Sequence, residues 1–95
     1  MRIRYTLRAR ADLREIRSYL LERSPRAAVA VLTTIRRRIA WLADFPLMAP
    51  ATDEPGVRAL PVVQYPYRVY YEVLGDEVWI LHVRHTRRQP WEPRR

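Results

Sequence analysis

The chain has 95 residues, and 18 basic against 10 acidic side chains give it a formal net charge of +8. A chain of this length folds as one small domain and has no room for a second core. It contains no cysteine, which excludes disulfides and thiol chemistry, and its 2 histidines are too few for a zinc site. We therefore expect no metal and no other cofactor.

The basic residues are all arginine, because the chain contains no lysine. A strong positive balance favours an anionic partner, either a nucleic acid or an acidic protein. Codon bias in a GC-rich genome also produces lysine-free chains. Arginine content therefore does not by itself establish phosphate recognition, although each guanidinium suits bidentate contact with phosphate or carboxylate.

The chain lacks the sequence features of membrane insertion or export. No apolar run approaches the roughly 18 residues of a membrane span. The first residues, Met1 to Arg4, alternate in the manner of a strand, where a signal peptide would need a long apolar stretch. We therefore expect a cytoplasmic protein that makes no membrane contact.

The first half of the chain predicts a strand and two helices. Residues 1–6 alternate, which predicts a half-buried strand. Leu13, Ile16 and Leu20 recur at helical spacing and predict a helix over residues 9–23. Ser24 and Pro25 are an N-cap and a first helical residue, so a second helix follows over residues 25–43.

The second half predicts a proline-rich loop and three strands. Residues 57–63 favour a strand at an edge or with a kink, because Pro61 cannot donate to a ladder. The runs 67–73 and 78–85 predict a hairpin around Gly75, and residues 89–95 form a polar tail. Two helices joined by a short connection should pack on one face of a mainly antiparallel sheet, which gives a single α+β domain over residues 1–95.

The hairpin register follows if its loop is residues 75–77 with a bulge at the turn. Tyr71 then lies opposite Leu81, and Val69 lies opposite Val83. One face is apolar and carries Tyr67, Val69, Tyr71, Val73, Trp79, Leu81 and Val83, with His85 at its end. The other carries Arg68, Tyr70, Glu72, Ile80, His82 and Arg84. This second face is predicted to be open to a partner.

Several segments, in this order, resemble the RelE/ParE superfamily of bacterial type II toxins, the plasmid-stabilisation toxins. They are the opening strand, the helix beginning at residues 11–16, the Phe-Pro loop after the second helix, and the segments 56–58, 67–71 and 83–88. The resemblance covers nearly the whole chain. It implies a small twisted antiparallel β-sheet with an N-terminal strand and a two-helix hairpin packed on one face.

The resemblance also implies a toxin that inhibits growth until a cognate antitoxin binds it, commonly through an acidic C-terminal segment, in a hetero-oligomer. The cellular target stays open. ParE-like toxins act on DNA gyrase without being nucleases, whereas RelE-like toxins are endoribonucleases that cut messenger RNA in the ribosome. The spacing of His85 and Arg88 is close to the His-x-x-Arg ending of ParE-like sequences.

If the chain cuts RNA, the resemblance gives His85 the role of general acid or base, and Arg68 and Arg88 the roles of phosphate clamps. RelE-like nucleases usually place a catalytic tyrosine five or six residues beyond that His or Arg. Here the nearest aromatic residue is Trp91, which can stack on a base but cannot exchange a proton. The absence of that tyrosine favours DNA gyrase over messenger RNA as the target. Candidate contacts with nucleic acid or another target are Arg58, Arg68, Tyr70, His82, Arg84, Arg87, Arg88 and Trp91.

Other interpretations remain beside these. His82 lies inside a strand, where histidine is more often structural than catalytic, and we expect Asp12 and Glu15 to face solvent without acid-base work. Outside the toxins, the open sheet face suits a nucleic-acid-binding module, and the edge at residues 57–63 suits a module that accepts a peptide strand.

Overall fold

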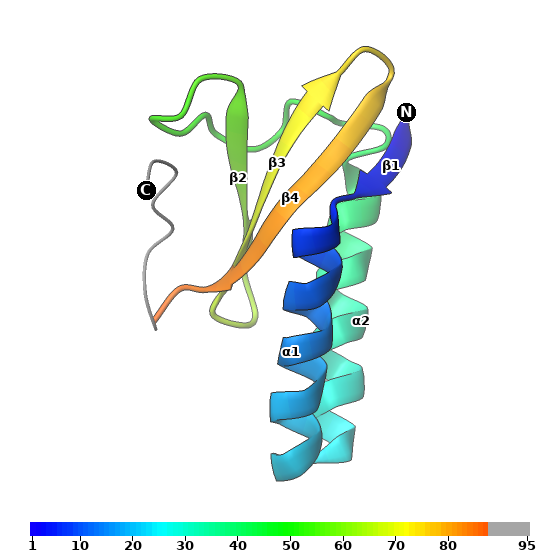
Figure 1. The fold of residues 1–95 in the computed structure, drawn as a ribbon, viewed down its shortest axis with the longest axis vertical. Helices are drawn as coiled ribbons and strands as arrows, with labels where there is room; N and C mark the ends of the chain where they lie inside the picture. Colours follow the sequence, from blue (N-terminus) through cyan, green and yellow to red (C-terminus); the bar gives the residue numbers. More distant parts are fainter. Residues whose placement is uncertain (88–95) are drawn as a thin grey trace.

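The computed structural model describes residues 1–87, so the tail expected at 89–95 lies outside the described residues. The elements are β1 (Arg2–Tyr5), α1 (Leu7–Arg23), α2 (Pro25–Trp41), β2 (Val57–Val62), β3 (Tyr67–Leu74) and β4 (Glu77–His85). The four strands form one sheet in the order β1-β4-β3-β2, and the two helices form a hairpin on one of its faces (Figure 1). This is the predicted α+β architecture.

Both helices begin at a hydroxyl cap. The Thr6 hydroxyl accepts a hydrogen bond from the Ala9 N–H at 3.0 Å, which begins α1 two residues earlier than the apolar spacing indicates. The Ser24 hydroxyl accepts from the Ala27 N–H at 3.1 Å, and Pro25 follows as the first residue of α2. These caps satisfy N–H groups that the first helical turns leave without partners.

The core lies between the helical hairpin and the sheet. Helix α2 contributes Ile35 and Ile39, and its C-cap contributes Leu42, all at most 1% exposed; the sheet contributes residues of all three long strands. Fully burying a side chain of this size stabilises the fold by about 1.5–3 kcal/mol relative to leaving it exposed. The tip of the helical hairpin, around Ser24, extends beyond the sheet (Figure 1).

The sheet is mixed. The pairs β2–β3 and β3–β4 are antiparallel, as predicted, but β1 pairs with β4 in parallel, with Ile3 beside Val78. The whole helical hairpin separates β1 from the rest of the sheet in sequence, so no tight turn fixes the direction in which β1 pairs. Within residues 1–87, no helix combines the length and the apolar character needed to cross a bilayer.

The predicted register of the β-hairpin is correct for the half far from the turn and wrong for the half next to the turn. Val69 pairs with Val83 as predicted, but Tyr71 pairs with Ile80, and Leu81 is the extra residue of a β-bulge. The turn holds only Gly75, with φ +61°, and Asp76, so the extra residue is accommodated inside the strand. Val78 and Ile80 therefore enter the core in place of Trp79 and Leu81.

The outer edge of β2 is occupied by the chain itself. The loop before it pairs along its first half, where Thr52 donates to the Val57 carbonyl at 2.9 Å and Ala59 donates to the Pro50 carbonyl at 3.0 Å. Further along, Pro61 has no N–H, and its carbonyl accepts from Arg38 at 3.1 Å. This edge has few groups left to pair, which argues against the strand addition considered for residues 57–63.

Candidate functional site

The start of α1 continues along the edge of β4 where β1 ends. The Thr6 N–H donates to the Ile80 carbonyl at 3.0 Å, and the Thr6 hydroxyl donates to the carbonyl of the bulged Leu81 at 3.1 Å. One and a half turns later, the Asp12 carboxylate accepts from the Val83 N–H at 2.9 Å. The N-cap Thr6 and the α1 side chain Asp12 thus take the place of a neighbouring strand, and they satisfy backbone groups of β4 that would otherwise lack partners.

The same Asp12 oxygen lies 2.5 Å from Nδ1 of His82, a residue only 2% exposed. Nε2 of that ring lies 3.1 Å from an Arg8 guanidinium nitrogen and 3.0 Å from one of Arg84. Guanidinium groups are donors only, so Nε2 accepts and Nδ1 carries the hydrogen that faces the carboxylate. We call Asp12, His82, Arg8 and Arg84 the inner cluster. The expectation that Asp12 faces solvent is wrong.

The bulge at Leu81 explains why His82 joins this cluster. Side chains alternate along a strand, so without an extra residue His82 would share the core face with Val78 and Ile80. The bulge shifts the alternation by one, which sends Val83 into the core and His82 to the face away from the helices. The imidazole then points its two nitrogens at groups from α1 and β4.

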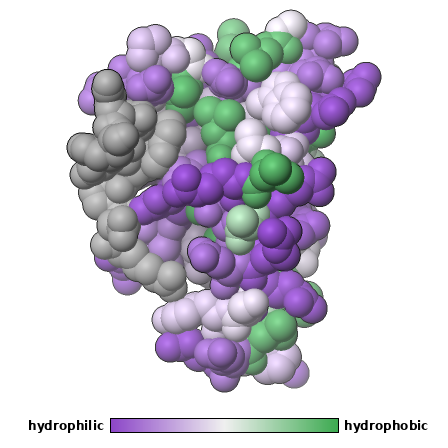
Figure 2. All heavy atoms as spheres, viewed as in Figure 1, coloured by the Kyte–Doolittle hydropathy of each residue, from purple (hydrophilic) through white to green (hydrophobic). Residues whose placement is uncertain are grey.

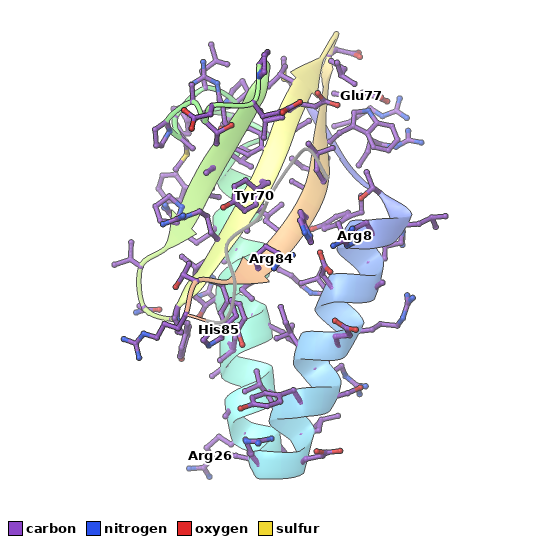
Figure 3. The ribbon with its side chains drawn as sticks, turned by 60° about the vertical axis from the view of Figure 1, so that its left-hand side comes forward. Arg8, Arg26, Tyr70, Glu77, Arg84 and His85 are labelled. Atoms are coloured by element: carbon purple, nitrogen blue, oxygen red, sulfur yellow. The ribbon has the colours of Figure 1, made fainter. Side chains whose placement is uncertain are left out.

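The inner cluster positions two guanidinium groups at the surface. Arg8 and Arg84 lie where α1 meets β4 (Figure 3), and hydrophilic residues form a band across this face of the molecule (Figure 2). Arg8 also lies 3.7 Å from Asp12, which offsets part of the repulsion between the two cations. A hollow of about 500 Å³ beside them is lined by Arg8, Asp12, Glu15, Arg84 and His85, among others.

Arg68 extends this cationic surface. It pairs with Arg84 across β3 and β4, and directly opposed like charges destabilise a sheet. Tyr70 pairs with His82 across the same two strands, and the centroids of the two rings lie 6.3 Å apart. We call Arg8, Arg68 and Arg84 the arginine surface. It offers donors to carboxylates or phosphates on a partner.

The structure places Arg68 and His85 on opposite faces of the sheet. His85 pairs with the core residue Tyr67, whose ring it meets edge to face at 5.1 Å, whereas Arg68 and Arg84 form the next pair and face away from the helices. Nδ1 of His85 also accepts from the Arg87 N–H at 3.2 Å. Arg88, the third residue of the predicted nuclease set, lies outside the described residues.

The other predicted contact residues are spread over the molecule. Arg58 pairs with the core residue Tyr71, so it points to the helix side, where it donates to the Ala49 carbonyl at 2.8 Å. Arg87 lines a different hollow with Arg68, next to the loop between β2 and β3. Trp91 lies outside the part of the chain that the structure describes.

The sequence analysis missed Arg8 and Asp12 as site residues. Their i,i+4 spacing on α1 is a signal for an ion pair, but nothing local connects them with His82, which lies 70 residues further along the chain than Asp12. Across residues 1–87, no group of three or more His, Cys, Asp or Glu side chains is arranged to hold a metal ion.

Comparison with known proteins agrees with this fold and defines a class, the small toxins of bacterial toxin-antitoxin systems. A chain from a structure of the chromosomal ParDE system of P. aeruginosa superposes with a TM-score of 0.79 at 26% identity, covering 90% of this chain and 95% of that one. The protein Y4kP of Sinorhizobium fredii, a candidate toxin by name, is 37% identical over 92 residues, which are 93% of this chain and 91% of Y4kP.

The family model that describes the ParE toxin of the type II toxin-antitoxin system parDE matches residues 3–90. The chain therefore belongs to the ParE toxin family. This agrees with the resemblance that the sequence segments indicate.

Proposed function

We propose that this chain arrests bacterial growth by acting on DNA gyrase through a protein interface that includes the arginine surface. Membership of the ParE toxin family is the observation that carries the proposal. Gyrase is an intracellular target, so this action would take place in the cytoplasm. Binding another protein needs a complementary surface and no catalytic constellation, and exposed arginine is enriched in protein interfaces.

The positions of the candidate nuclease residues support the same choice. Cleavage of RNA needs a proton-transfer group and a cation within reach of one phosphate. Arg68 and His85 project from opposite faces of the sheet, and His82 is buried with both ring nitrogens occupied. RNA cleavage by a RelE-like mechanism remains the alternative, and it would require His85 to act with Arg8 and Arg84, which line the same hollow, in place of Arg68.

We also infer that an antitoxin neutralises the chain in a hetero-oligomer. The similar P. aeruginosa chain comes from a ParDE toxin-antitoxin system, and the net charge of +8 suits a partner with acidic segments. Because association between opposite charges is steered electrostatically, we expect this complex to form quickly at low salt.

The experiment is induction of the chain in a bacterial host, with pulse labelling of DNA and protein synthesis and a supercoiling assay on purified gyrase. We expect DNA synthesis to stop first and supercoiling to fall. Arg84→Ala should weaken the effect on gyrase by roughly tenfold, which corresponds to about 1.4 kcal/mol of interface energy. Arg26→Ala, at the far tip of the helical hairpin (Figure 3), is the matched control.

His85→Ala separates the two mechanisms. A nuclease that uses His85 in proton transfer would lose roughly 10²–10⁴ in cleavage rate. A gyrase inhibitor should retain most of its activity, because His85 faces the helix side of the sheet and packs on Tyr67. Early loss of protein synthesis, with messenger RNA cut at ribosomes and activity lost in His85→Ala, would contradict the gyrase proposal.

A further inference from the structure

The hydrogen bonds of the inner cluster run in one direction through the His82 ring. The Asp12 carboxylate accepts from Nδ1 of His82 and from the Val83 N–H, so the ring nitrogen that faces it carries the hydrogen. The opposite nitrogen, Nε2, then has a lone pair, which faces the guanidinium groups of Arg8 and Arg84. The carboxylate on one side of the ring therefore decides whether the other side can accept.

The acceptor Nε2 is shared by two elements. A ring nitrogen has one lone pair, and donors from α1 and from β4 reach it at 3.1 and 3.0 Å. The Arg8 side chain is 62% exposed, so without this bond little would restrict its rotamers. Each guanidinium carries five N–H donors, of which a bond to the ring uses one. The ring thus orders both cations without neutralising them.

The ring is enclosed by groups from three elements. His82 is buried, and the charged and titratable groups that face it within residues 1–87 are Asp12 and Arg8 from α1, Arg84 from β4 and Tyr70 from β3. With a neutral ring, the cluster holds two cations and one anion. Protonation adds a third cation and turns Nε2 into a donor that points at two other donors.

We propose that His82 is a positioning residue of the target interface. Asp12 holds it in the tautomer that orders Arg8 and Arg84, and protonation of the ring releases both arginines. This inference rests on the proposed action on gyrase. An interface whose cations are already ordered loses less side-chain entropy on binding than one that must order them. Binding should therefore need the neutral ring and should weaken as pH falls through the range of about 8 to 5, in which histidine becomes charged.

Two amide substitutions separate the roles of the two ring nitrogens. Glutamine can place its carbonyl oxygen near the position of Nε2, whereas the shorter asparagine reaches only the position of Nδ1. His82→Gln should keep an acceptor for the arginines and retain inhibition of gyrase within about threefold. His82→Asn should keep only the bond to Asp12 and weaken inhibition roughly tenfold, because two side chains must then be ordered on binding. Equal losses would show that the ring only fills space, and the proposal would be wrong.

Asp12→Asn tests the carboxylate. The amide oxygen can still accept from the Val83 N–H, but the amide nitrogen can donate to Nδ1, which moves the ring hydrogen to Nε2. Inhibition should weaken roughly tenfold, with little further loss when His82→Asn is added, because both changes remove the same contact. Glu22→Gln makes the same change of charge at an exposed position near the far end of α1 and is the matched control. Losses that multiply would mean that Asp12 and His82 act separately, against the proposal.

Nitrogen NMR of the isotope-labelled chain tests the cluster without gyrase. At about pH 8, the His82 signals should show a hydrogen on Nδ1 and a bare, hydrogen-bonded Nε2. The guanidinium signals of Arg8 and Arg84 should be those of ordered groups, and they should change together with the ring signals as the pH is lowered. In Asp12→Asn the hydrogen should move to Nε2. A hydrogen on Nε2 in the original chain would overturn the inference.

The pH profile of inhibition separates positioning from packing. The original chain and His82→Gln are compared at each pH, so that the pH dependence of gyrase itself cancels. The other histidine, His85, is present in both chains, and its titration cancels as well. Inhibition by the original chain should fall relative to His82→Gln as the pH is lowered, since an amide takes up no proton in this range. A constant ratio would contradict release by protonation.

The NMR measurement keeps this inference separate from the proposed function. If the original chain does not inhibit gyrase, the proposed function fails, and the tautomer of His82 and the order of the two arginines still decide whether the cluster is built as proposed. If the chain inhibits gyrase and both His82→Asn and Asp12→Asn inhibit it equally well, the proposed function stands and the inference fails.

Discussion

Helix α1 carries a polar cluster on each side, and the two clusters differ in how their charges are balanced. In the inner cluster, Asp12 accepts from His82 and from the Val83 backbone, and the ring accepts from Arg8 and Arg84. On the other side of α1, a pocket of about 230 Å³ is lined by Tyr5, Arg10, Arg14 and Arg36, with Leu13 and with no carboxylate, and we call these four residues the outer cluster. One helix therefore supports both a balanced network and an unbalanced one.

The difference separates a contribution to folding from a capacity for binding. Buried polar groups stabilise a fold only when their partners are present, and the inner cluster supplies these partners from within the chain. Cations that converge without a counter-ion raise the energy of the free protein, and a ligand that supplies the counter-charge relieves that repulsion on binding. The comparison can be tested by removing one residue at a time from each cluster.

The largest effect is expected from Asp12→Ala in the inner cluster. The substitution leaves the Val83 N–H and the buried His82 ring without their acceptor, between two arginines that lose their nearest carboxylate. Breaking a buried polar network in this way typically costs about 2–4 kcal/mol. The free energy of unfolding, measured by denaturant titration, should fall by this amount.

Glu15→Ala is the matched control for that measurement. Glu15 lies one turn further along α1 and lines the same hollow, but no hydrogen bond or ion pair involves it within residues 1–87. We expect a change within about 0.5 kcal/mol, as for most surface substitutions. Similar losses for the two variants would show that Asp12 acts through the charge of the helix and not through His82.

The sequence predicted most of the fold and little of the inner cluster. The apolar spacing and the N-cap and first helical residue at Ser24-Pro25 predicted the helical hairpin, and Gly75 predicted the β-hairpin. These signals are local in the sequence, so they can be recognised without knowledge of the fold. The predicted register was wrong for the half of the hairpin next to the turn, because a bulge at Leu81 changes which residues face the core. The alternating pattern of the sequence fits the strand with or without this bulge. A bulge of this kind is fixed by contacts with Thr6, far away in sequence.

The inner cluster escaped prediction for a related reason. Asp12 and His82 lie on different elements, and only the parallel docking of β1 on β4 brings the start of α1 beside His82. The sequence grouped Arg68, Tyr70, His82 and Arg84 correctly on one face, since they share the alternation of the hairpin. It grouped Arg68 with His85 through family resemblance, and the alternation puts those two on opposite faces.

A smaller effect of opposite sign is expected from Arg14→Ala in the outer cluster. The substitution removes a repelling cation from an i,i+4 pair and should raise the free energy of unfolding by about 0.2–0.5 kcal/mol, beyond the gain from the higher helix propensity of alanine. Added salt should shrink this gain, because it screens the repulsion in the original chain.

Arg37→Ala is the control for the helix propensity of alanine in this stability measurement. Arg37 is exposed on α2 and makes no ion pair within residues 1–87, so its substitution reports what alanine contributes in a helix. If Arg14→Ala stabilises the chain no more than Arg37→Ala does, the arginines of the outer cluster do not repel one another, and the comparison of the two clusters loses its energetic basis.

The smallest change in the free energy of unfolding at neutral pH is expected from Tyr5→Phe. The change should become measurable only at alkaline pH. Burial raises the pKa of Tyr5 above its ordinary value of 10.0, and the nearby Arg36 and Arg10 lower it by less. Tyr71 also has a pKa raised by burial. The chain has no lysine or cysteine, and arginine keeps its proton, so tyrosines are the side chains that titrate in this range.

The direction of the pH effect follows from where the protons are bound. Above pH 10.0 the unfolded chain releases the Tyr5 proton while the folded chain keeps it, so the free energy of unfolding falls as pH rises. Below that pH both states hold the proton, and this residue contributes no pH dependence. In Tyr5→Phe the fall should be shallower, as measured by denaturant titration across this range alongside tyrosinate absorbance. An unchanged slope would mean that Tyr5 ionises as freely in the folded chain as in water, and that the outer cluster is open to solvent at its tyrosine.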